Sequence, residues 1–293
     1  MNNGPECIPC CLRRVLRTAD LVTSDEWLHR KILGEVMQDL ARVDELTTPA
    51  EVVHGAARRT AKTLGVGDPY ADEKRRWVDE IIGNADLVRG VIDESADPFV
   101  TALKFSLAAN LIDCEFRDEI VRGFSLKTLL SEVEDLPFVA DGIEDFRASV
   151  AQAPTVLFVH DTAGELFFDR LLIEKLDKPR DRVVSVVRES PILGDATRED
   201  AEAVGLDEVA RIVDPGISCL GLPLTACSES FRQEYRGANL VVAKGQAAYQ
   251  TLEGSNGQIE AEPKELYFLL RVKCPVMSRQ LGVAVGDCVL EAG

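Results

Sequence analysis

Two aspartates each follow a short apolar run in the second half of the chain, where their carboxylates could bind a cation. Asp161 comes after residues 155–159, and Asp195 comes after residues 182–187. If both runs are parallel strands, their carboxyl ends meet at one edge of a sheet, where ligands collect. Paired carboxylates there suit magnesium or manganese, which prefer oxygen ligands. Both residues also precede predicted helices, so helix capping stays an alternative.

Two neighbouring features could bind a phosphate. Ala163-Gly164-Glu165 opens a predicted helix, where free backbone N–H groups attract anions. Lys244-Gly245 follows the apolar run 240–243 and places a cation beside a glycine that permits close backbone approach. The alternative interpretation is that Lys244 is an ordinary surface lysine at a turn. Neither a GxxxxGK[ST] loop nor a GxGxxG fingerprint occurs, which disfavours a P-loop nucleotide site and a nicotinamide cofactor.

Cysteines and histidines offer weaker signals. Cys7-Ile8-Pro9-Cys10 has zinc-ligand spacing and Cys274 could supply a third thiolate, but a structural zinc site needs four ligands and no second CxxC exists. Buried thiols are the alternative. His160 lies beside Asp161 and could act as a ligand, acid or base, or it could be a packed histidine. The absence of HExxH and GxSxG disfavours a histidine-rich zinc hydrolase and a serine hydrolase.

The elements that must position these residues alternate between strands and helices after residue 153. The predicted strands cover residues 155–159, 182–187, 208–213, 240–243 and 267–272. The predicted helices cover residues 165–176, 198–204, 228–235 and 275–281, and residues 283–291 could add an edge strand. This alternation predicts βαβ units and a parallel sheet.

The first half of the chain is predicted to be helical. Apolar residues recur at three- and four-residue steps in segments such as 26–43 and 71–88. Proline and glycine break the pattern near residues 49, 65–69 and 97–98, and no strand is predicted before residue 150. We therefore predict an α/β protein with a helical domain over residues 1–153 and an α/β metal- and phosphate-binding domain over residues 154–293.

Composition limits the partners. The 293 residues contain 33 Lys and Arg against 50 Asp and Glu, and this formal net charge of −17 disfavours nucleic acid and anionic membranes. A small phosphorylated metabolite remains compatible, because local cations or a metal can reverse the potential. No apolar run is long enough to span a bilayer and the start lacks a secretory h-region, so we expect a cytoplasmic protein whose cysteines are thiols. The oligomeric state is not indicated.

The order of these motifs resembles the shorter, prokaryotic-type branch of the damage-control phosphatase family, also named domain of unknown function 89. The resemblance runs nearly end to end. It includes Cys7-x-x-Cys10, Asp68-Pro69-Tyr70 with Lys74, Asn110-Leu111-Ile112-Asp113, Asp161-Thr162-Ala163-Gly164-Glu165, Gly194-Asp195-Ala196-Thr197, Lys244-Gly245-Gln246 and Lys273-Cys274-Pro275. It implies a Rossmann-like parallel sheet with a helical N-terminal domain, and metal-dependent hydrolysis of sugar phosphates, phosphopantetheine-type molecules or damaged phosphometabolites.

The resemblance also implies residue roles. Asp161, Thr162 and Asp195 would bind a divalent metal such as magnesium, manganese, cobalt or nickel. Lys244 would contact the phosphate. Four further residues would bind substrate, with the first two closing the pocket from the helical domain: Asn110, Asp113, Gly164 and Glu165.

Several positions depart from the family pattern. Thr162 and Gly194 stand where the family has asparagine, and Ala109 replaces a glycine. Ala247 and Ala248 lie in a segment that lacks the family's Asn and Glu. These changes support a second hypothesis, a member that binds a phosphometabolite or partner without efficient turnover. A third hypothesis is a zinc or redox protein that acts through Cys7, Cys10 and Cys274, which would retain zinc on purification.

Overall fold

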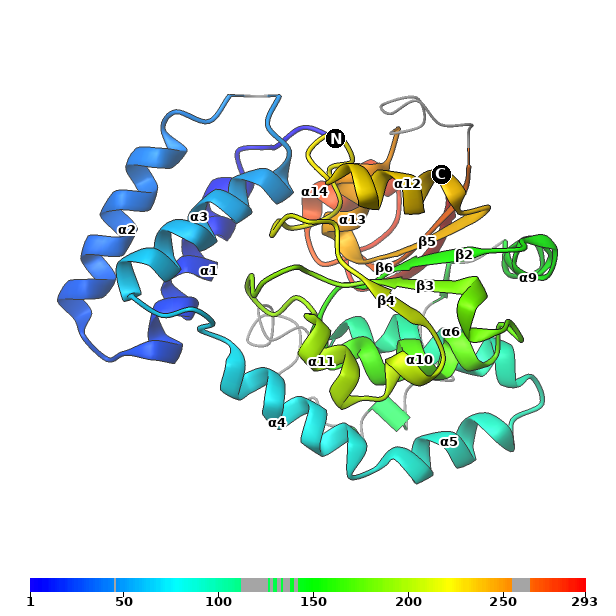
Figure 1. The fold of residues 1–293 in the computed structure, drawn as a ribbon. Helices are drawn as coiled ribbons and strands as arrows, with labels where there is room; N and C mark the ends of the chain where they lie inside the picture. The colour runs from blue at the N-terminus through cyan, green and yellow to red at the C-terminus, as the bar shows by residue number, and fades with distance from the viewer. Residues whose placement is uncertain are drawn as a thin grey trace.

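Three N-terminal helices form a group of their own in the computed structural model, which describes residues 1–44, 46–111, 126, 129–130, 133, 138–139, 142–254 and 264–293. They are α1 (Cys7–Val22), α2 (Glu26–Leu40) and α3 (Pro49–Leu64), which project from the rest of the molecule (Figure 1). The Thr48 and Glu51 side chains form a capping box at the start of α3, and Gly65 ends it in the left-handed conformation. Their shared core contains Cys11, Val15, Ala19, Ile32, Val36, Leu40, Val52 and Ala56.

The remaining helices of the first half pack beneath the sheet. They are α4 (Ala71–Ile82), α5 (Ala85–Asp93), α6 (Pro98–Ala108), the 3-10 turn η1 (Ala109–Leu111) and α9 (Ile143–Gln152). The predicted helix over residues 71–88 is wrong as one element, because the chain turns at Gly83 and Asn84 and starts α5. Their apolar side chains share one core with the sheet. The domain boundary at residue 153 stays a prediction.

The described strands form one seven-stranded sheet in the order β1-β7-β6-β5-β2-β3-β4. Neighbouring strands are parallel except β6 and β7, so the predicted, mostly parallel sheet is confirmed. The strands are β1 (Phe138–Val139), β2 (Val156–Val159), β3 (Val183–Val186), β4 (Arg211–Val213), β5 (Leu240–Lys244), β6 (Glu265–Arg271) and β7 (Cys288–Ala292).

Two strand predictions need correction. We predicted no strand before residue 150, but Phe138–Val139 forms β1 and pairs with β7. The predicted edge strand over residues 283–291 exists as Cys288–Ala292, and β1 covers its outer side. A two-residue strand carries too little periodicity to be recognised in a sequence.

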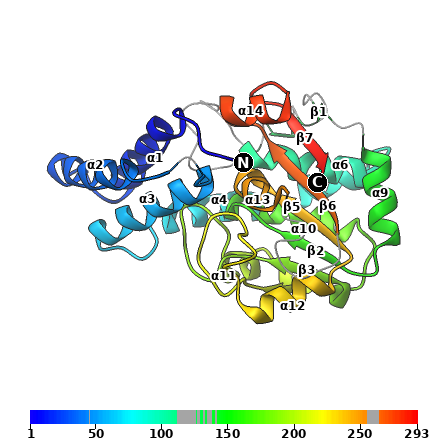
Figure 2. The same cartoon turned by 90° about the horizontal axis from the view of Figure 1, so that it is seen from above.

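Helices cover both faces of the sheet (Figures 1 and 2). On one face lie α4–α6, α10 (Leu166–Glu174) and α11 (Arg198–Ala203). On the other lie α12 (Glu229–Gly237), α13 (Gly245–Leu252) and α14 (Pro275–Leu281). Successive side chains of a strand point to opposite faces, so Val156 and Phe158 join the first core while Leu157 and Val159 join the second. Burial on both faces explains the continuous apolar runs of the central strands.

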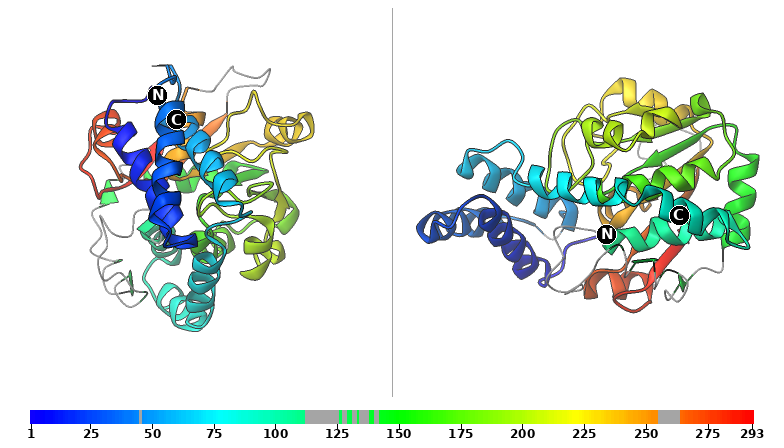
Figure 3. Two further views of the ribbon diagram at one scale, coloured as in Figure 1. Left: turned by 90° about the vertical axis from the view of Figure 1, so that its left-hand side faces the viewer. Right: turned by 90° about the horizontal axis from the view of Figure 1, so that it is seen from below.

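The N-terminal helices lie against the carboxyl ends of the central strands (Figure 3). The 3-10 turn η2 (Ala163–Glu165) follows β2, α11 follows β3 and α13 follows β5. Helix α3 contacts α13, and α4 contacts both η2 and α11. The strand ends where ligands collect in parallel sheets are therefore covered by α3 and α4. No helix among the described residues is long and apolar enough to cross a membrane.

Candidate functional site

The two aspartates singled out in the sequence lie on paired backbone segments beyond β2 and β3. Asp161 O accepts a hydrogen bond of 2.9 Å from Ala196 N, and Gly194 O accepts one of 3.0 Å from Ala163 N. Between these bonds, Thr162 and Asp195 form an isolated antiparallel bridge. The parallel strands thus end in a local backbone pairing that brings the Asp161 and Asp195 segments side by side.

The Asp161 carboxylate is fixed by an amide and by a glycine. Asn110, in η1, donates through Nδ2 to Asp161 Oδ2 at 3.1 Å and accepts at Oδ1 from Arg271 N at 3.3 Å. Gly245 has a φ of +81°, and a Cβ built there would lie 1.9 Å from Asp161 Oδ2. The backbone after β5 can pass this carboxylate only because residue 245 has no side chain and tolerates a positive φ.

The Asp195 carboxylate is held by a buried arginine that sequence reasoning missed. Arg188 Nε donates to Asp195 Oδ2 at 2.6 Å, and its Nη1 donates to Gly221 O at 2.8 Å. Burial alone would lower the pKa of Arg188, but the Asp195 carboxylate outweighs burial and raises it. The sequence signal was a charged residue directly after the apolar run 183–187, a position that a parallel strand end places in the interior.

Glu165 connects the aspartate segment to its neighbours. Its Oε1 accepts from Thr162 Oγ1 and from Asn110 Nδ2, both at 2.7 Å, and its Oε2 lies 2.8 Å from Lys244 Nζ. The residue is fully buried within η2, and the predicted helix begins one residue later, at Leu166. The Thr162 hydroxyl proton is therefore used by Glu165, which leaves the oxygen lone pairs of that hydroxyl as acceptors.

Lys244 lies deeper than its neighbours. Its ammonium contacts Asp169 Oδ1 and Ser106 O, both at 2.7 Å, besides Glu165, and the side chain is fully buried. Burial opposes the charge, but the carboxylates of Asp169 and Glu165 outweigh it and raise the pKa of Lys244. The ammonium is thus already surrounded by protein acceptors.

His160 belongs to the same buried network. Its Nδ1 lies 2.9 Å from Asp169 Oδ2, and its Nε2 lies 3.1 Å from Ser185 Oγ. The ring also stacks on Phe158 with centroids 4.8 Å apart. Both ring nitrogens have partners inside the protein, so the structure agrees with the packed-histidine alternative. Asp169 was missed in the sequence, although a charged residue inside the apolar segment 166–173 was its signal.

The predicted site residues in the described part of the chain are thus brought together. The structure places Asn110, Asp161, Thr162, Glu165, Asp195 and Lys244 around the ends of β2, β3 and β5. Gly164 lies in η2 with no side chain to contribute. Asp113 lies outside the described residues.

A comparison with protein families identifies the family of the chain. The model of the damage-control phosphatase ARMT1-like domain matches residues 4–289. The chain belongs to this family. A damage-control phosphatase from Archaeoglobus fulgidus is 32% identical, and the match covers 99% of each chain. The damage-control phosphatase PH1575 from Pyrococcus horikoshii is 29% identical over 97% of this chain and 96% of that protein.

A solved structure extends the similarity to the fold. The crystal structure of a DUF89 family protein from Pyrococcus horikoshii superposes with a TM-score of 0.85 at 28% sequence identity, covering 100% of this chain and 99% of that one. The resemblance inferred from the motifs is therefore confirmed, as is the α/β class with its helical N-terminal region. Membership of the damage-control phosphatase family supports a phosphatase that acts on damaged metabolites.

The donor chemistry of this family member fits a hard divalent cation. Asp161 and Asp195 supply carboxylate oxygens and Thr162 supplies a hydroxyl oxygen on the paired segments. Within the described part of the chain, no group of three His, Cys, Asp or Glu side chains is placed to hold a metal ion. Two carboxylates, completed by water or substrate oxygens, are the pattern that magnesium accepts.

The cysteine motif lies apart from these oxygens. Cys7 and Cys10, on the first turns of α1, line a pocket together with Cys274. All described cysteines are free thiols, and these three do not form a metal-binding group. Cys274 instead caps α14, where its Sγ accepts from Met277 N. These contacts give the zinc hypothesis no support.

Proposed function

We propose that this protein is a divalent-metal-dependent phosphatase that hydrolyses phosphate monoesters of small metabolites. One observation carries the proposal: Asp161 and Asp195 lie on paired segments at the carboxyl edge of the sheet, with the backbone of Gly245 packed directly against Asp161. This arrangement places two carboxylates and the Thr162 hydroxyl on neighbouring backbone segments at the edge where ligands collect in parallel sheets. The substrate would be a small phosphorylated metabolite, such as a sugar phosphate or a phosphopantetheine-type molecule.

In this proposal, Asp161, Asp195 and Thr162 would hold the metal, which would supply positive charge to neutralise the phosphoryl group. The protein's own contribution is to fix these donors. Asn110 holds the Asp161 carboxylate from the helical side, and Arg188 holds the Asp195 carboxylate from the sheet. Such outer contacts orient ligand oxygens and keep their geometry through a reaction.

Lys244, whose ammonium contacts Glu165, is proposed to supply positive potential to the phosphate. Its ammonium already contacts Glu165, Asp169 and Ser106, so direct contact with a phosphate requires one of these acceptors to be replaced. Glu165 is buried and positions Thr162 and Asn110. We therefore assign Glu165 a positioning role and Gly164 a backbone contact with substrate.

The test is a phosphatase screen with magnesium, manganese, cobalt and nickel against p-nitrophenyl phosphate, sugar phosphates and phosphopantetheine. Asp161→Asn and Asp195→Asn should each lower kcat/KM at least about 100-fold and weaken metal binding in calorimetry. Asp207→Asn, at an exposed position, is the matched control and should retain activity. Full activity in both site variants would refute the proposed site.

A second candidate is a binding protein with little turnover. Two observations favour it: the Thr162 hydroxyl donates to Glu165, and the Lys244 ammonium is surrounded by protein acceptors. In that case a phosphometabolite with metal would raise the melting temperature while no phosphate is released. Release of inorganic phosphate in a metal-dependent manner would exclude this second candidate.

A further inference from the structure

A buried lysine links the helical region to the segment that carries Asp195. Lys74 lies on α4 and is 4% exposed. Its Nζ lies 2.8 Å from Asp68 Oδ2 and 3.0 Å from Asp200 Oδ2. Asp68 precedes α4, whereas Asp200 lies in the first turn of α11, 126 positions after the lysine. These three residues, named here the Lys74 ion triad, thus join two separate parts of the protein.

The ion triad reaches the backbone after Asp195 through Asp200. Besides the contact with Lys74, Asp200 Oδ2 accepts hydrogen bonds from Thr197 N at 2.9 Å and from Thr197 Oγ1 at 2.7 Å. Thr197 is the N-cap of α11, and it forms a capping box with Asp200. The Lys74 ammonium therefore holds the carboxylate that fixes the residue two positions after Asp195.

The lysine keeps its charge in this buried position. Burial alone would lower the pKa of Lys74, but the carboxylates of Asp200 and Asp68 outweigh burial and raise it. The side chains of the two aspartates are only 15% and 17% exposed, so water and salt screen these ion pairs less than pairs on the surface. A charged lysine between two fixed carboxylates restricts the directions that the Asp200 side chain can take.

The rest of the Asp195 segment is held from the sheet. Ala196 N donates to Asp161 O at 2.9 Å, and Arg188 N donates to Ala196 O at 2.8 Å. These two bonds come from the residues that follow β2 and β3, whereas the ion triad approaches from α4. The segment is thus held from two sides, and Lys74 acts on the side of the helical region.

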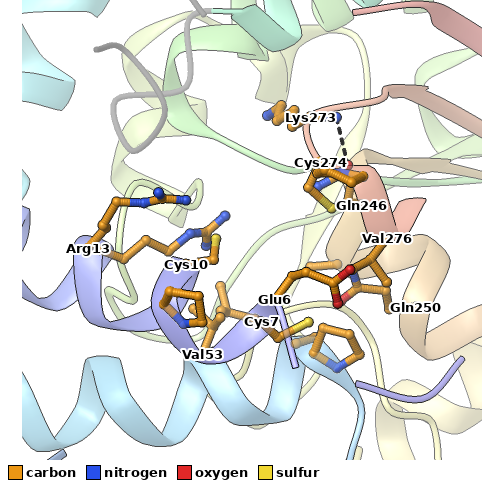
Figure 4. A pocket seen from close by; sticks show the side chains of 17 residues that line it. Glu6, Cys7, Cys10, Arg13, Val53, Gln246, Gln250, Lys273, Cys274 and Val276 are labelled. Atoms are coloured by element: carbon orange, nitrogen blue, oxygen red, sulfur yellow. Dashed lines mark hydrogen bonds between the residues drawn. The ribbon is translucent and has the colours of Figure 1, made fainter. Parts of the chain in front are cut away.

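The helical region meets the sheet domain differently at two places. Where α1 faces α13 and α14, a pocket of about 270 Å³ remains, with Cys7 on one wall and Cys274 on the other (Figure 4). Where α4 faces α11, the ammonium of Lys74 is in direct contact with Asp200. The members of the ion triad do not line the pocket. The ion triad is therefore a direct link between α4 and the start of α11.

We propose that Lys74 is a positioning residue for the proposed metal site, acting through Asp200 and Thr197 on the backbone that carries Asp195. The proposal rests on the proposed function and adds to it a residue outside the ligand set. Loss of a contact that orients a metal ligand lowers metal affinity by about 10- to 100-fold. Because Lys74 acts through two intervening residues, we expect a loss near the lower end of this range.

The test is a cycle of two substitutions in the whole protein, with manganese as the probe. Lys74→Met and Asp200→Asn should each weaken manganese binding in calorimetry about 10-fold. The double variant should bind within about twofold of the weaker single variant, because both changes break the same contact. Losses that multiply in the double variant would overturn the proposal, since Lys74 would then act by another route.

Steady-state kinetics distinguish positioning from substrate binding. At saturating manganese, Lys74→Met should keep the KM for p-nitrophenyl phosphate within about twofold of the wild type, because the lysine acts on a metal ligand rather than on the phosphate. A KM raised about 10-fold under these conditions would overturn the proposal, since Lys74 would then contact the substrate.

Ile81→Ala is the matched control for lost stability. Ile81 lies on the same helix, is 1% exposed and belongs to the core shared with the sheet. Its truncation should lower the melting temperature and leave manganese affinity within about twofold of the wild type. If Ile81→Ala weakened manganese binding as much as Lys74→Met does, general destabilisation would explain both results and the proposal would be overturned.

Amide hydrogen exchange of the metal-free protein separates this inference from the proposed function. Lys74→Met should speed exchange in residues 192–200 about 10-fold, while exchange in residues 240–244 of β5 changes less than about twofold. If the wild type binds no manganese and releases no phosphate, the proposed function fails, and exchange alone decides whether Lys74 holds this segment. Unchanged exchange in residues 192–200 would overturn the proposal.

Discussion

Two groups of charged residues lie near the carboxyl ends of β2, β3 and β5, and one of them is more deeply buried than the other. The aspartate pair, Asp161 and Asp195, lies on paired loop segments and retains 7% and 3% exposure. The lysine network, Lys244, Asp169 and His160, is at most 1% exposed. In the lysine network, His160 follows β2 and Lys244 ends β5, whereas Asp169 lies within α10. The two groups therefore differ in burial, and the aspartate pair keeps more exposed surface than the lysine network.

The lysine network acts as a frame for the aspartate pair. Lys244 joins β5 to α10 through Asp169 and to η2 through Glu165, and Glu165 in turn positions Thr162 and Asn110. A fully buried charge is stable only when its partners compensate its lost hydration. The network therefore holds the ends of the strands in place, and this positions the backbone segments that carry Asp161 and Asp195.

The largest effect should follow from breaking the network at its centre. Lys244→Met leaves Asp169 and Glu165 buried without their cation, which should lower the free energy of unfolding by about 3–5 kcal/mol. Urea denaturation measures this, with Lys31→Met at an exposed position of α2 as the control. If Lys244→Met unfolds like the wild type yet loses phosphatase activity, the comparison fails and Lys244 belongs with the ligand-binding group.

A smaller effect on stability, with a large one on activity, is expected at Gly245. Gly245→Ala and Gly282→Ala both place a side chain at a positive φ, of 81° and 71°, and this backbone conformation alone should cost about 1 kcal/mol at either position. Only at residue 245 would the Cβ meet Asp161 Oδ2, whereas nothing lies within 4 Å of the Cβ at residue 282. Phosphatase activity should thus fall at least about 10-fold in Gly245→Ala alone. Equal activities in the two variants would place the reaction elsewhere.

The smallest effect is a dependence of stability on pH. Burial alone would raise the pKa of Asp169. The neighbouring Lys244 and His160 lower this pKa by more than burial raises it, so the folded-state pKa lies below 3.8. Its stabilisation is present above that value and is lost as the pH falls. Below about pH 3.8, where the unfolded state binds this proton and the folded state does not, stability should therefore drop by up to about 1.4 kcal/mol per pH unit until the pH passes the folded-state pKa.

This slope can be assigned to Asp169 by substitution. Asp169→Asn protein should be less stable at every pH and should show a shallower decline in urea denaturation over the same interval. At the basic end, the raised pKa of Lys244 keeps its contribution until the pH exceeds 10.5. An unchanged acid slope in Asp169→Asn would show that other carboxylates dominate it.

The sequence allowed the strands to be predicted because burial on both faces makes β2, β3, β5 and β6 continuous apolar runs. Helix α13 was not predicted, because it begins at Gly245 directly after β5 with no connecting turn. The break between α4 and α5 was also missed, since apolar spacing continues across Gly83. Periodicity finds buried faces, but it does not show where a chain changes direction.

The place of the candidate site in the fold could be predicted from the sequence, but the contacts of its side chains could not. Parallel topology places residues after strands at one edge, so Asp161, Asp195 and Lys244 were expected close together. Asp169 was not predictable as a partner of Lys244, because it lies in α10, whose approach depends on how this helix packs on the sheet. Asn110 was expected at the site only through the family resemblance, and Arg188 was missed although it follows β3 at the same edge. Sequence spacing gave no reason to expect that Lys244 would be enclosed by acceptors.

The sharing of one core by α6 and the sheet has a consequence during protein synthesis. Helix α6 (Pro98–Ala108) is buried along almost its whole length, but the strands in the same core end only near residue 290. At about 5–20 residues per second, ribosomes need roughly 10–40 s to add the intervening residues. Through that interval this apolar helix has no sheet to pack against. The nascent chain should therefore expose the apolar surface of this helix until β5 and β6 emerge.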